Sequence, residues 1–399
     1  MATYKAEFLS HYYEHHWRPR QAWAFGRVHD WARLAALAPR AVNTMTAAPV
    51  LGSLAKLAAG MANDRRIPAF APQTFRHWFL SRAASPPREG PRVVLWPDTF
   101  NDHFHPETLR AAVDVLEGSG FTVQIPREPL CCGRPLYDYG MLPRARQQLE
   151  RVMASLRDEI SAGVPIVGLE PSCVSVFRDE LRAFFPERED ARRLQAQTMT
   201  AAELLARSDR LPAAALQRRV LMHGHCHHKA IMGRDADRTL LDRLGVDREE
   251  PDSGCCGMAG SFGFEAAHVP VSRAIGERVL LPAVRSAAAD TVIVADGFSC
   301  REQIAQETGR RAIHLVELVH MAMFHGPHGP DGPKPERVYA RDQEADRLPW
   351  TQVAGAVLLA AALPLLARSA ARLFSGDGRA ATPSVPLPVR AGGRGSARY

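Results

Sequence analysis

Two adjacent cysteines followed by a glycine occur twice in this chain, and this repeated Cys-Cys-Gly triplet constrains the fold and the chemistry most. The triplets lie in the stretches PLCCGRPLYDYG (129–140) and DSGCCGMAGSFGFE (252–265). Adjacent cysteines rarely form a disulfide with each other, because the small ring strains the intervening peptide bond. Seven cysteines is also an odd number, which argues against a secreted disulfide framework. We therefore interpret the cysteines as ligands of a metal or cluster, or as a redox relay, in a reducing compartment.

Strand-like and helix-like segments alternate around both triplets in the same order. Around the first triplet, strands are expected at 92–98, 121–126 and 165–173 and helices at 106–120 and 142–163. Around the second, strands are expected at 218–226 and 291–300 and helices at 235–245 and 268–287. The spacing repeats as well, since 41 residues separate Cys132 from Cys173 and 44 separate Cys256 from Cys300. This alternation predicts an α/β fold of duplicated, Rossmann-like βα repeats with parallel sheets.

The chain of 399 residues is long enough for two domains or one large duplicated unit. A helical N-terminal segment is expected first, because apolar stretches such as LGSLAKLAAGMA are separated by prolines. We expect the following regions: a helical segment at 1–90, the first repeat at 91–215, the second repeat at 216–322, a flexible linker at 323–348, a hydrophobic helix at 349–374 and a disordered tail at 375–399.

A stretch of 19 residues without charge runs from Pro349 to Ala367, which is just long enough to span a bilayer. Arginines lie on both flanks, so no orientation follows, and a surface anchor or a packed helix are the alternatives. The N-terminus has no secretory hydrophobic core, so we expect a cytoplasmic protein, with the inner membrane face as a further partner. The net charge of +7 comes mostly from dispersed arginines, which predicts a solvated surface and no nucleic-acid binding.

Four cysteines of the second repeat are expected to meet at one edge of its sheet. Cys226 and Cys300 directly follow apolar strands, and Cys255 and Cys256 belong to the triplet loop. Four thiolates are the usual complement of a [4Fe–4S] cluster, and soft sulfur ligands select iron–sulfur, zinc or copper(I). Gly257 lets the backbone fold closely around a cluster and offers an amide donor to its sulfurs. The alternative, that these cysteines are buried small hydrophobes, fits the doubled spacing poorly.

The first repeat has three matching cysteines, Cys131, Cys132 and Cys173. Where the fourth is expected, the chain has PDTFNDHFH, and Asp98 or Thr99 stands near the position of Cys226. Three thiolates leave three hypotheses for this site: an iron with an open coordination position, a cluster shared with the other half, or a site that has lost its metal.

Histidines surround Cys226 in the string HGHCHHK. They are candidates for metal ligation, for tuning a cluster potential, or for passing a proton to a quinone or an acid substrate. Ordinary hydrogen-bonding roles in a loop are the alternative for each. The set is His223, His225, His227 and His228, of which the last three are our candidate catalytic residues. His103 and His105 occupy the corresponding loop of the first repeat, and would face the same cleft if a pseudo-dyad relates the halves.

Zinc is the main competitor for the thiolates. Closed structural zinc sites usually contain C-x-x-C knuckles, and none occurs in this chain, which lowers the expectation for zinc. A thiol–disulfide enzyme is disfavoured for the same reason.

Several stretches resemble the cysteine-rich CCG-domain family, which includes the iron–sulfur subunit of glycolate oxidase, one of the subunits of heterodisulfide reductase, and lactate-utilisation proteins. They are PDTFNDHFHPE, CCGRPLYDYGML, GLEPSCVSVFRDEL, HGHCHHKA, DSGCCGMAGSFGFE and ADGFSCREQI. The chain resembles the C-terminal part of fused FAD-linked dehydrogenases of D-2-hydroxy acids, of the D-lactate or D-2-hydroxyglutarate type. The likeness covers roughly residues 1–320. The upstream ferredoxin-like cysteine run and the flavin-binding part of the fused type are not found in this sequence.

The resemblance implies an oxidoreductase component that carries electrons from a FAD-containing partner, by way of a ferredoxin-type cluster domain, to a quinone or another acceptor. The ligands expected are Cys226, Cys255, Cys256 and Cys300 for an iron–sulfur cluster, with Cys131, Cys132 and Cys173 as a companion site. Without a flavin domain the chain should not oxidise the hydroxy acid. Two alternatives remain: a catalytic reductase of disulfides or carboxylates at the paired-cysteine cleft, and a zinc-stabilised docking module.

Overall fold

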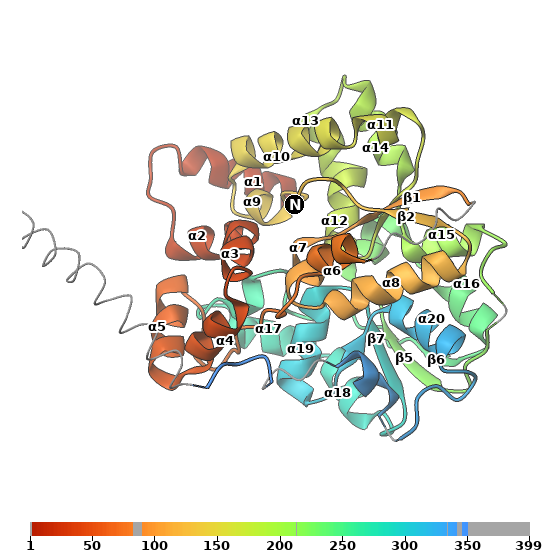
Figure 1. Ribbon diagram of the computed structural model, residues 1–399. Coiled ribbons are helices and arrows are strands. Elements are labelled where there is room, and N and C mark those ends of the chain that lie inside the picture. Colours follow the sequence, from red (N-terminus) through yellow and green to blue (C-terminus); the bar gives the residue numbers. More distant parts are fainter. Residues whose placement is uncertain (1, 83–89, 213, 333, 341–344, 350–399) are drawn as a thin grey trace, which may run out of the picture. The chain divides into compact units, whose positions relative to one another are not determined.

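A computed structural model describes residues 2–82, 90–212, 214–332, 334–340 and 345–349 (Figure 1). Helices come first: α1 (Ala2–Tyr12), α2 (Arg20–Gly26), α3 (Val28–Ala35), α4 (Pro39–Ala47), α5 (Pro49–Ala59) and α6 (Phe75–Ser81). Prolines stand at the start of α4 and α5, where a helix needs no amide hydrogen and the fixed φ suits helical backbone. The helical N-terminal segment expected from the sequence is confirmed.

Two four-stranded parallel sheets follow, and they have the same strand order. The first contains β1 (Arg92–Trp96), β2 (Thr122–Gln124), β3 (Ile166–Gly168) and β4 (Thr198–Thr200), ordered β2-β1-β3-β4. The second contains β5 (Arg219–His223), β6 (Asp247–Glu249), β7 (Val292–Ala295) and β8 (Ala312–Ile313), ordered β6-β5-β7-β8. The predicted fold of duplicated α/β repeats with parallel sheets is therefore confirmed.

Helices connect the strands in both halves and also follow the last strand. In the first half they are α7 (Thr99–His103), α8 (Pro106–Gly118), α9 (Arg134–Asp138), α10 (Leu142–Ser155), α11 (Arg157–Ser161), α12 (Pro171–Ser175), η1 (Val176–Glu180), α13 (Leu181–Phe184), α14 (Glu189–Gln197) and α15 (Ala201–Arg207). In the second they are η2 (His228–Met232), α16 (Asp235–Leu244), η3 (Phe262–Phe264), α17 (Val269–Gly276), α18 (Leu280–Ser286), α19 (Phe298–Thr308), α20 (Leu315–Phe324) and η4 (Pro335–Tyr339).

The two longest expected helices are each divided in two. The helix predicted over 142–163 is interrupted at Leu156, whose backbone leaves the helical region at ψ 17°. The helix predicted over 268–287 ends at Gly276 and begins again at Leu280, because Val279 adopts a non-helical backbone.

Successive side chains of a strand point to opposite faces of the sheet and therefore pack into different hydrophobic cores. Val93 and Leu95 of β1 belong to a core that also contains Val220 and Met222 of β5, whereas Val94 belongs to a separate core on the opposite face. Helices α8, α15, α16 and α20 contribute to the common core and lie between the two sheets (Figure 1). The halves therefore share one hydrophobic layer.

The helix pairing within this layer has an approximate two-fold symmetry. Helix α8 follows the first strand of its sheet and packs on α20, which follows the last strand of the other sheet. Helix α16, the counterpart of α8, packs in the same way on α15, the counterpart of α20. Exchange of the halves thus preserves the contacts, as in an isologous dimer interface.

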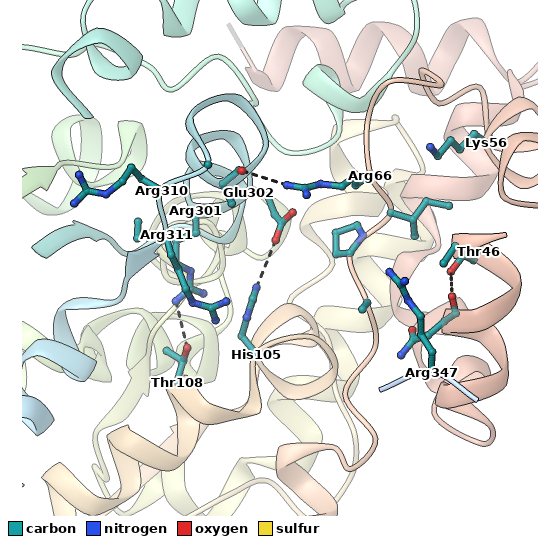
Figure 2. Close-up of a pocket in the computed structure, with 18 of the residues that line it drawn as sticks. Thr46, Lys56, Arg66, His105, Thr108, Arg301, Glu302, Arg310, Arg311 and Arg347 are labelled. Carbon is teal, nitrogen blue, oxygen red and sulfur yellow. Dashed lines mark hydrogen bonds and ion pairs between the residues drawn. The ribbon is translucent and has the colours of Figure 1, made fainter. Parts of the chain in front are cut away.

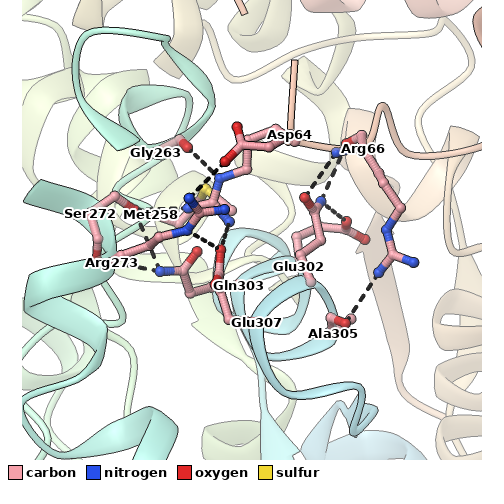
Figure 3. A network of polar contacts seen from close by, with 12 residues as sticks. Asp64, Arg66, Met258, Gly263, Ser272, Arg273, Glu302, Gln303, Ala305 and Glu307 are labelled. Atoms are coloured by element: carbon pink, nitrogen blue, oxygen red, sulfur yellow. Dashed lines mark hydrogen bonds and ion pairs between the residues drawn. The ribbon is translucent and has the colours of Figure 1, made fainter. Parts of the chain in front are cut away.

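A buried arginine attaches the N-terminal segment to the second half. The guanidinium of Arg65, which has no exposed surface, donates to the carbonyl oxygen of Gly263 at 2.8 Å and to the Glu307 carboxylate at 2.7 Å. Arg273 also pairs with Glu307, at 2.9 Å, and with Asp64, at 2.6 Å (Figure 3). This network holds the backbone just beyond the second triplet.

Among the described residues, no helix is long and apolar enough to cross a membrane. The expected hydrophobic helix from residue 350 onward and the expected tail at 375–399 lie outside the described residues.

Candidate metal centre

The strand order determines where functional side chains gather. In each sheet the chain moves outward from its first strand to its second and then returns to the other side, which creates a crevice outside the carboxyl ends of the two central strands. Cys226 follows β5 and Cys300 lies in the first turn of α19, directly after β7. Cys173 lies in α12, directly after β3. Both triplets lie in loops after the second strand of their sheet, so all seven cysteines sit beyond the carboxyl ends of strands.

The four thiols of the second repeat form a continuous series of neighbours. Cys226 interacts with Cys255, Cys255 with Cys256, and Cys256 with Cys300. Cys256 and Cys300 are buried, while Cys226 and Cys255 are partly exposed. The structure therefore brings together the four residues that the sequence proposed as ligands, with two of them reachable from solvent.

The glycine of each triplet adopts a left-handed backbone that places its amide against a sulfur. Gly257 has φ 91° and donates to Cys255 Sγ at 3.3 Å, and Gly133 has φ 84° and donates to Cys131 Sγ at 3.4 Å. A Cβ on Gly257 would lie 2.0 Å from the carbonyl oxygen of Ser272, so no other residue fits without moving backbone. The amide donor expected at Gly257 is therefore present, and Gly133 provides a counterpart in the first repeat.

Three histidines of HGHCHHK lie beside thiols. The Nδ1 atoms of His225 and His227 are 3.9 and 4.0 Å from Cys226 Sγ. His223 bonds Ser253 Oγ through Nδ1 at 2.7 Å, and one of its ring nitrogens lies within 4.8 Å of the sulfurs of Cys256 and Cys300. Burial, together with repulsion from the Arg134 guanidinium, lowers the pKa of His227 to about 3, so this imidazole is neutral at physiological pH.

His228 points elsewhere. It is buried with its Nδ1 3.6 Å from the Asp237 carboxylate and 3.8 Å from that of Asp296. Burial lowers the pKa of His228 to about 4 and raises the pKa of Asp237. His228 is therefore part of a buried polar cluster with Asp237 and Asp296, and its candidacy as a catalytic residue stays a prediction.

The thiols of the second repeat differ in acidity. The pKa of Cys255 is lowered by hydrogen bonds from Cys226 and Cys256, and that of Cys300 is lowered by Cys256 and by His223 and His225. The pKa values of Cys226 and Cys256 are raised, because their neighbours take the thiolate charge and burial disfavours a second one. The thiolates of Cys255 and Cys300 therefore form most readily, and thiolate is the form that ligates a soft cation.

The three thiols of the first repeat also meet. Cys132 Sγ donates to Cys173 Sγ at 3.0 Å, and Cys131 neighbours both Cys132 and the hydroxyl of Thr99. Thr99 begins α7 just after β1, which is the place that Cys226 takes after β5. The fourth corner of this site therefore carries oxygen in place of sulfur.

Burial and neighbouring anions make the first site less acidic. The pKa of Cys173 rises to about 12: the hydrogen bond from Cys132 lowers it, but burial and the carboxylates of Asp98 and Glu170 outweigh that effect. The pKa of Asp98 is itself raised to about 6 by burial and by Glu170. Thiolates are therefore harder to form here than in the second repeat.

His29 reaches the first site from the N-terminal helices, and no local pattern in the sequence indicated it. Its Nδ1 lies 3.0 Å from Thr99 Oγ1. Burial and the nearby Arg33 lower the pKa of His29 to about 4, so the ring is neutral. The residue lies on α3, outside either repeat, and only the folded chain brings it to Thr99.

Two contacts cross between the halves beside the thiols. The Glu170 carboxylate accepts the amide of Phe298 at 2.8 Å, and buried Arg301 donates to Asn101 Oδ1 at 2.7 Å. Glu170 stands in GLEPSC directly between β3 and Cys173, and that position is the only sequence signal it carried. The first turn of α19, which carries Cys300, is thus fixed by the opposite half.

His103 and His105 do not join the thiols. His103 is buried with Nε2 3.6 Å from Asp102, and burial lowers its pKa to about 4. His105 lies between Glu107, at 3.1 Å, and Glu302 of the other half, at 3.6 Å. The pseudo-dyad does bring His105 to the interface of the halves, but among the described contacts neither histidine touches a cysteine.

The side chains of the second repeat fit an iron–sulfur cluster. The site offers four cysteine sulfurs in a largely buried position, and the backbone amides of Gly257 and Met258 donate to two of these sulfurs. His223 with Cys256 and Cys300 also forms a set that suits zinc, which keeps the zinc alternative open.

Comparison with known proteins identifies the class. The model of the CCG family, described as cysteine-rich domain, matches residues 98–178 and 220–305. The matched segments lie one in each half, so each half is similar to the cysteine-rich CCG domain, and the resemblance inferred from the sequence is confirmed.

Three relatives illustrate the range of proteins to which the chain is similar. It is 29% identical to one of the subunits of the anaerobic glycerol-3-phosphate dehydrogenase of Escherichia coli, over 71% of this chain and 72% of that one. It is 27% identical to D-2-hydroxyglutarate dehydrogenase of Pseudomonas putida, over 79% of this chain but only 32% of that protein. It is 27% identical to lactate utilization protein A of Geobacillus kaustophilus, over 57% of this chain and 98% of the relative.

Proposed function

We propose that this protein is the iron–sulfur electron-transfer component of a flavin-linked dehydrogenase. Cys226, Cys255, Cys256 and Cys300 would hold the cluster, which we propose to be [4Fe–4S]. The observation that carries the proposal is the meeting of these four thiols at the crevice beyond β5 and β7, with backbone amides donating to two of the sulfurs. When bound, such a cluster accepts and gives up one electron at a time.

The residues around the cluster would determine how charge on the sulfurs is stabilised and from which side a redox partner approaches. The Gly257 and Met258 amides stabilise charge on sulfur, and neutral His227 beside Cys226 adds no positive charge. Cys226 and Cys255 are partly exposed, so they offer the side from which a redox partner approaches. We propose Cys131, Cys132 and Cys173, with Thr99 and His29, as a companion site of lower affinity.

We propose that the two-electron oxidation takes place on a flavin-containing partner. The names of the relatives refer to glycerol 3-phosphate, D-2-hydroxyglutarate and lactate, which are all alcohols that carry an anionic group. The choice of substrate would therefore belong to the partner, and a D-2-hydroxy acid remains our proposal for it. This chain without the flavin partner should reduce no acceptor dye when given such a substrate, and should do so when the partner is restored.

Metal analysis after anaerobic purification tests the cluster. We expect about four irons and four sulfides per chain, and a reduced sample with a paramagnetic resonance signal. Cys226→Ser should lose most of this iron and the signal, because serine oxygen is a poor substitute for sulfur. The matched variant Cys131→Ser should keep it.

Three other results would be informative. About eight irons, with half lost in Cys131→Ser, would show that the first site also holds a cluster. Stoichiometric zinc without iron would replace the proposal with the zinc-stabilised docking module. Reduction of a disulfide by the iron-loaded chain without a flavoprotein would favour the reductase alternative.

A further inference from the structure

A cavity of about 440 Å³ lies at the junction of the N-terminal helices and the two halves, apart from the cysteine sulfurs (Figure 2). Its walls come from α4, α5 and the segment before α6, from the start of α8, and from α19 and the loop into β8. The cavity is large enough for a small organic molecule.

Cationic side chains dominate this cavity. Six lysine and arginine side chains line the cavity from opposite walls, whereas only two carboxylates, those of Glu302 and Glu317, line it. Arg301, Arg310 and Arg311 stand on one side in Figure 2, with Lys56 and Arg347 across from them and Arg66 above. A partly enclosed space with this excess of positive charge concentrates the field on an anion.

The two carboxylates offset only part of this charge, because six cationic side chains face two anionic ones. Glu317 is buried and already accepts the Thr108 hydroxyl at 2.9 Å and the amide of His314 at 2.7 Å. Glu302 accepts a hydrogen bond from Gln306 at 3.0 Å and stands 3.6 Å from His105. Both are therefore engaged by neighbouring donors.

Several arginine nitrogens have no acceptor among the described residues. They are the buried Nε atoms of Arg301, Arg310 and Arg311. Arg301 is 5% exposed, and its terminal nitrogens reach only the neutral groups of Asn101 and Thr108. Arg311 pairs with Glu107 at 3.3 Å, and the buried Asp98 carboxylate interacts with the charge of Arg301 without a direct hydrogen bond among the described contacts. A buried guanidinium that bonds no carboxylate directly is costly, which favours an anionic partner for Arg301 in the cavity.

The first turn of α8 adds partial positive charge to the cavity. His105 precedes this helix of 13 residues, and His105 and Thr108 both line the cavity. The amino end of a helix carries partial positive charge, so it favours an anion in the same space.

We propose that this cavity binds a small organic or inorganic oxyanion with at least two negative charges, such as a dicarboxylate or a phosphate ester. Planar guanidinium groups from opposite walls bind such groups with paired hydrogen bonds. The ligand would join the N-terminal helices to α19, which carries Cys300 in its first turn. The proposal does not depend on the electron-transfer function, because it needs no metal.

Calorimetric titration at low ionic strength tests the proposal with five probes: inorganic phosphate, glycerol 3-phosphate, D-2-hydroxyglutarate, lactate and glycerol. We expect binding of at least one of the three doubly charged probes with a Kd of about 1 mM or tighter, at least tenfold weaker binding of lactate, and none of glycerol. Affinity should fall as salt is added.

Variants of the cavity rim provide the structural control. Arg66 and Arg347 are exposed, so Arg66→Gln with Arg347→Gln should fold normally and weaken the binding of the doubly charged probe at least tenfold. Arg144→Gln with Arg192→Gln removes the same charge from exposed positions outside the cavity and should leave the affinity unchanged.

Equal loss of affinity in both double variants would mean a general charge effect and would overturn the site. Absence of heat for all three doubly charged probes up to about 10 mM would overturn it as well. The iron content of the protein is measured in parallel, and is expected to be the same in both double variants.

Discussion

At the scale of single residues, Gly257 decides whether the second triplet keeps its shape. Its φ of 91° and the 2.0 Å approach of the Ser272 carbonyl oxygen exclude a side chain. We expect Gly257→Ala to lower the free energy of unfolding by about 2–4 kcal/mol, combining left-handed strain with a backbone clash. Because the Gly257 amide would move away from Cys255, iron content should fall too.

Gly163→Ala separates the clash from the strain. Gly163 has a similar φ, 72°, but no atom lies within 4 Å of the position of its Cβ. This variant should lose only about 1 kcal/mol and keep its iron. Chemical denaturation with iron analysis measures both, and equal losses in the two variants would contradict the role of the Ser272 contact.

The residues that could be predicted are those with a local signal. The cysteines follow apolar strands, and that placement alone indicated where Cys226 and Cys300 would meet. His29 and Arg65 carried no such signal, because their partners Thr99 and Glu307 lie far along the sequence. Identity and spacing cannot reveal a contact that only the folded chain creates.

At the scale of elements, Arg65 fixes the segment between α5 and α6 onto η3 and α19. Arg65→Met should lower the free energy of unfolding by about 3 kcal/mol, since the carbonyl oxygen of Gly263 and the carboxylate of Glu307 would lose a buried donor. Thermal or chemical denaturation measures this loss.

Arg273→Met is the matched control, because Arg273 pairs with the same Glu307 from a side chain that is 38% exposed. An exposed pair contributes little, so this change should be worth less than about 1 kcal/mol. If both variants were equally stable, burial would not be what makes the Arg65 contact important.

The central strands and the edge strand β2 could be predicted from the sequence, and the other edge strands could not. β1, β3, β5 and β7 fall inside apolar, β-branched runs that mark buried parallel strands. β4, β6 and β8 have two or three residues each, and β6 reads Asp-Arg-Glu at an open edge. Such strands are defined by pairing with a neighbour, which a local pattern does not show.

At the scale of the whole molecule, the shared layer of α8, α15, α16 and α20 makes the two halves one folding unit. The repeats are visible in the sequence as separate units, but the sequence does not show that one core serves both. Because that layer touches both sheets, neither half can lose its packing without exposing the apolar face of the other. Cooperative unfolding of residues 90–340 should follow.

A substitution far from the shared layer tests this cooperativity. Leu280 lies on α18, 1% exposed, in the separate core on the outer face of the second sheet. Leu280→Ala should lower stability by about 2–5 kcal/mol, and hydrogen exchange of the slowest amides should accelerate by the same factor in β1 as in β7. Leu280→Met, which conserves volume, should change both by less than about 1.5 kcal/mol. Acceleration confined to β5 and β7 would show instead that the halves unfold independently, and that the layer between them is an interface between two domains.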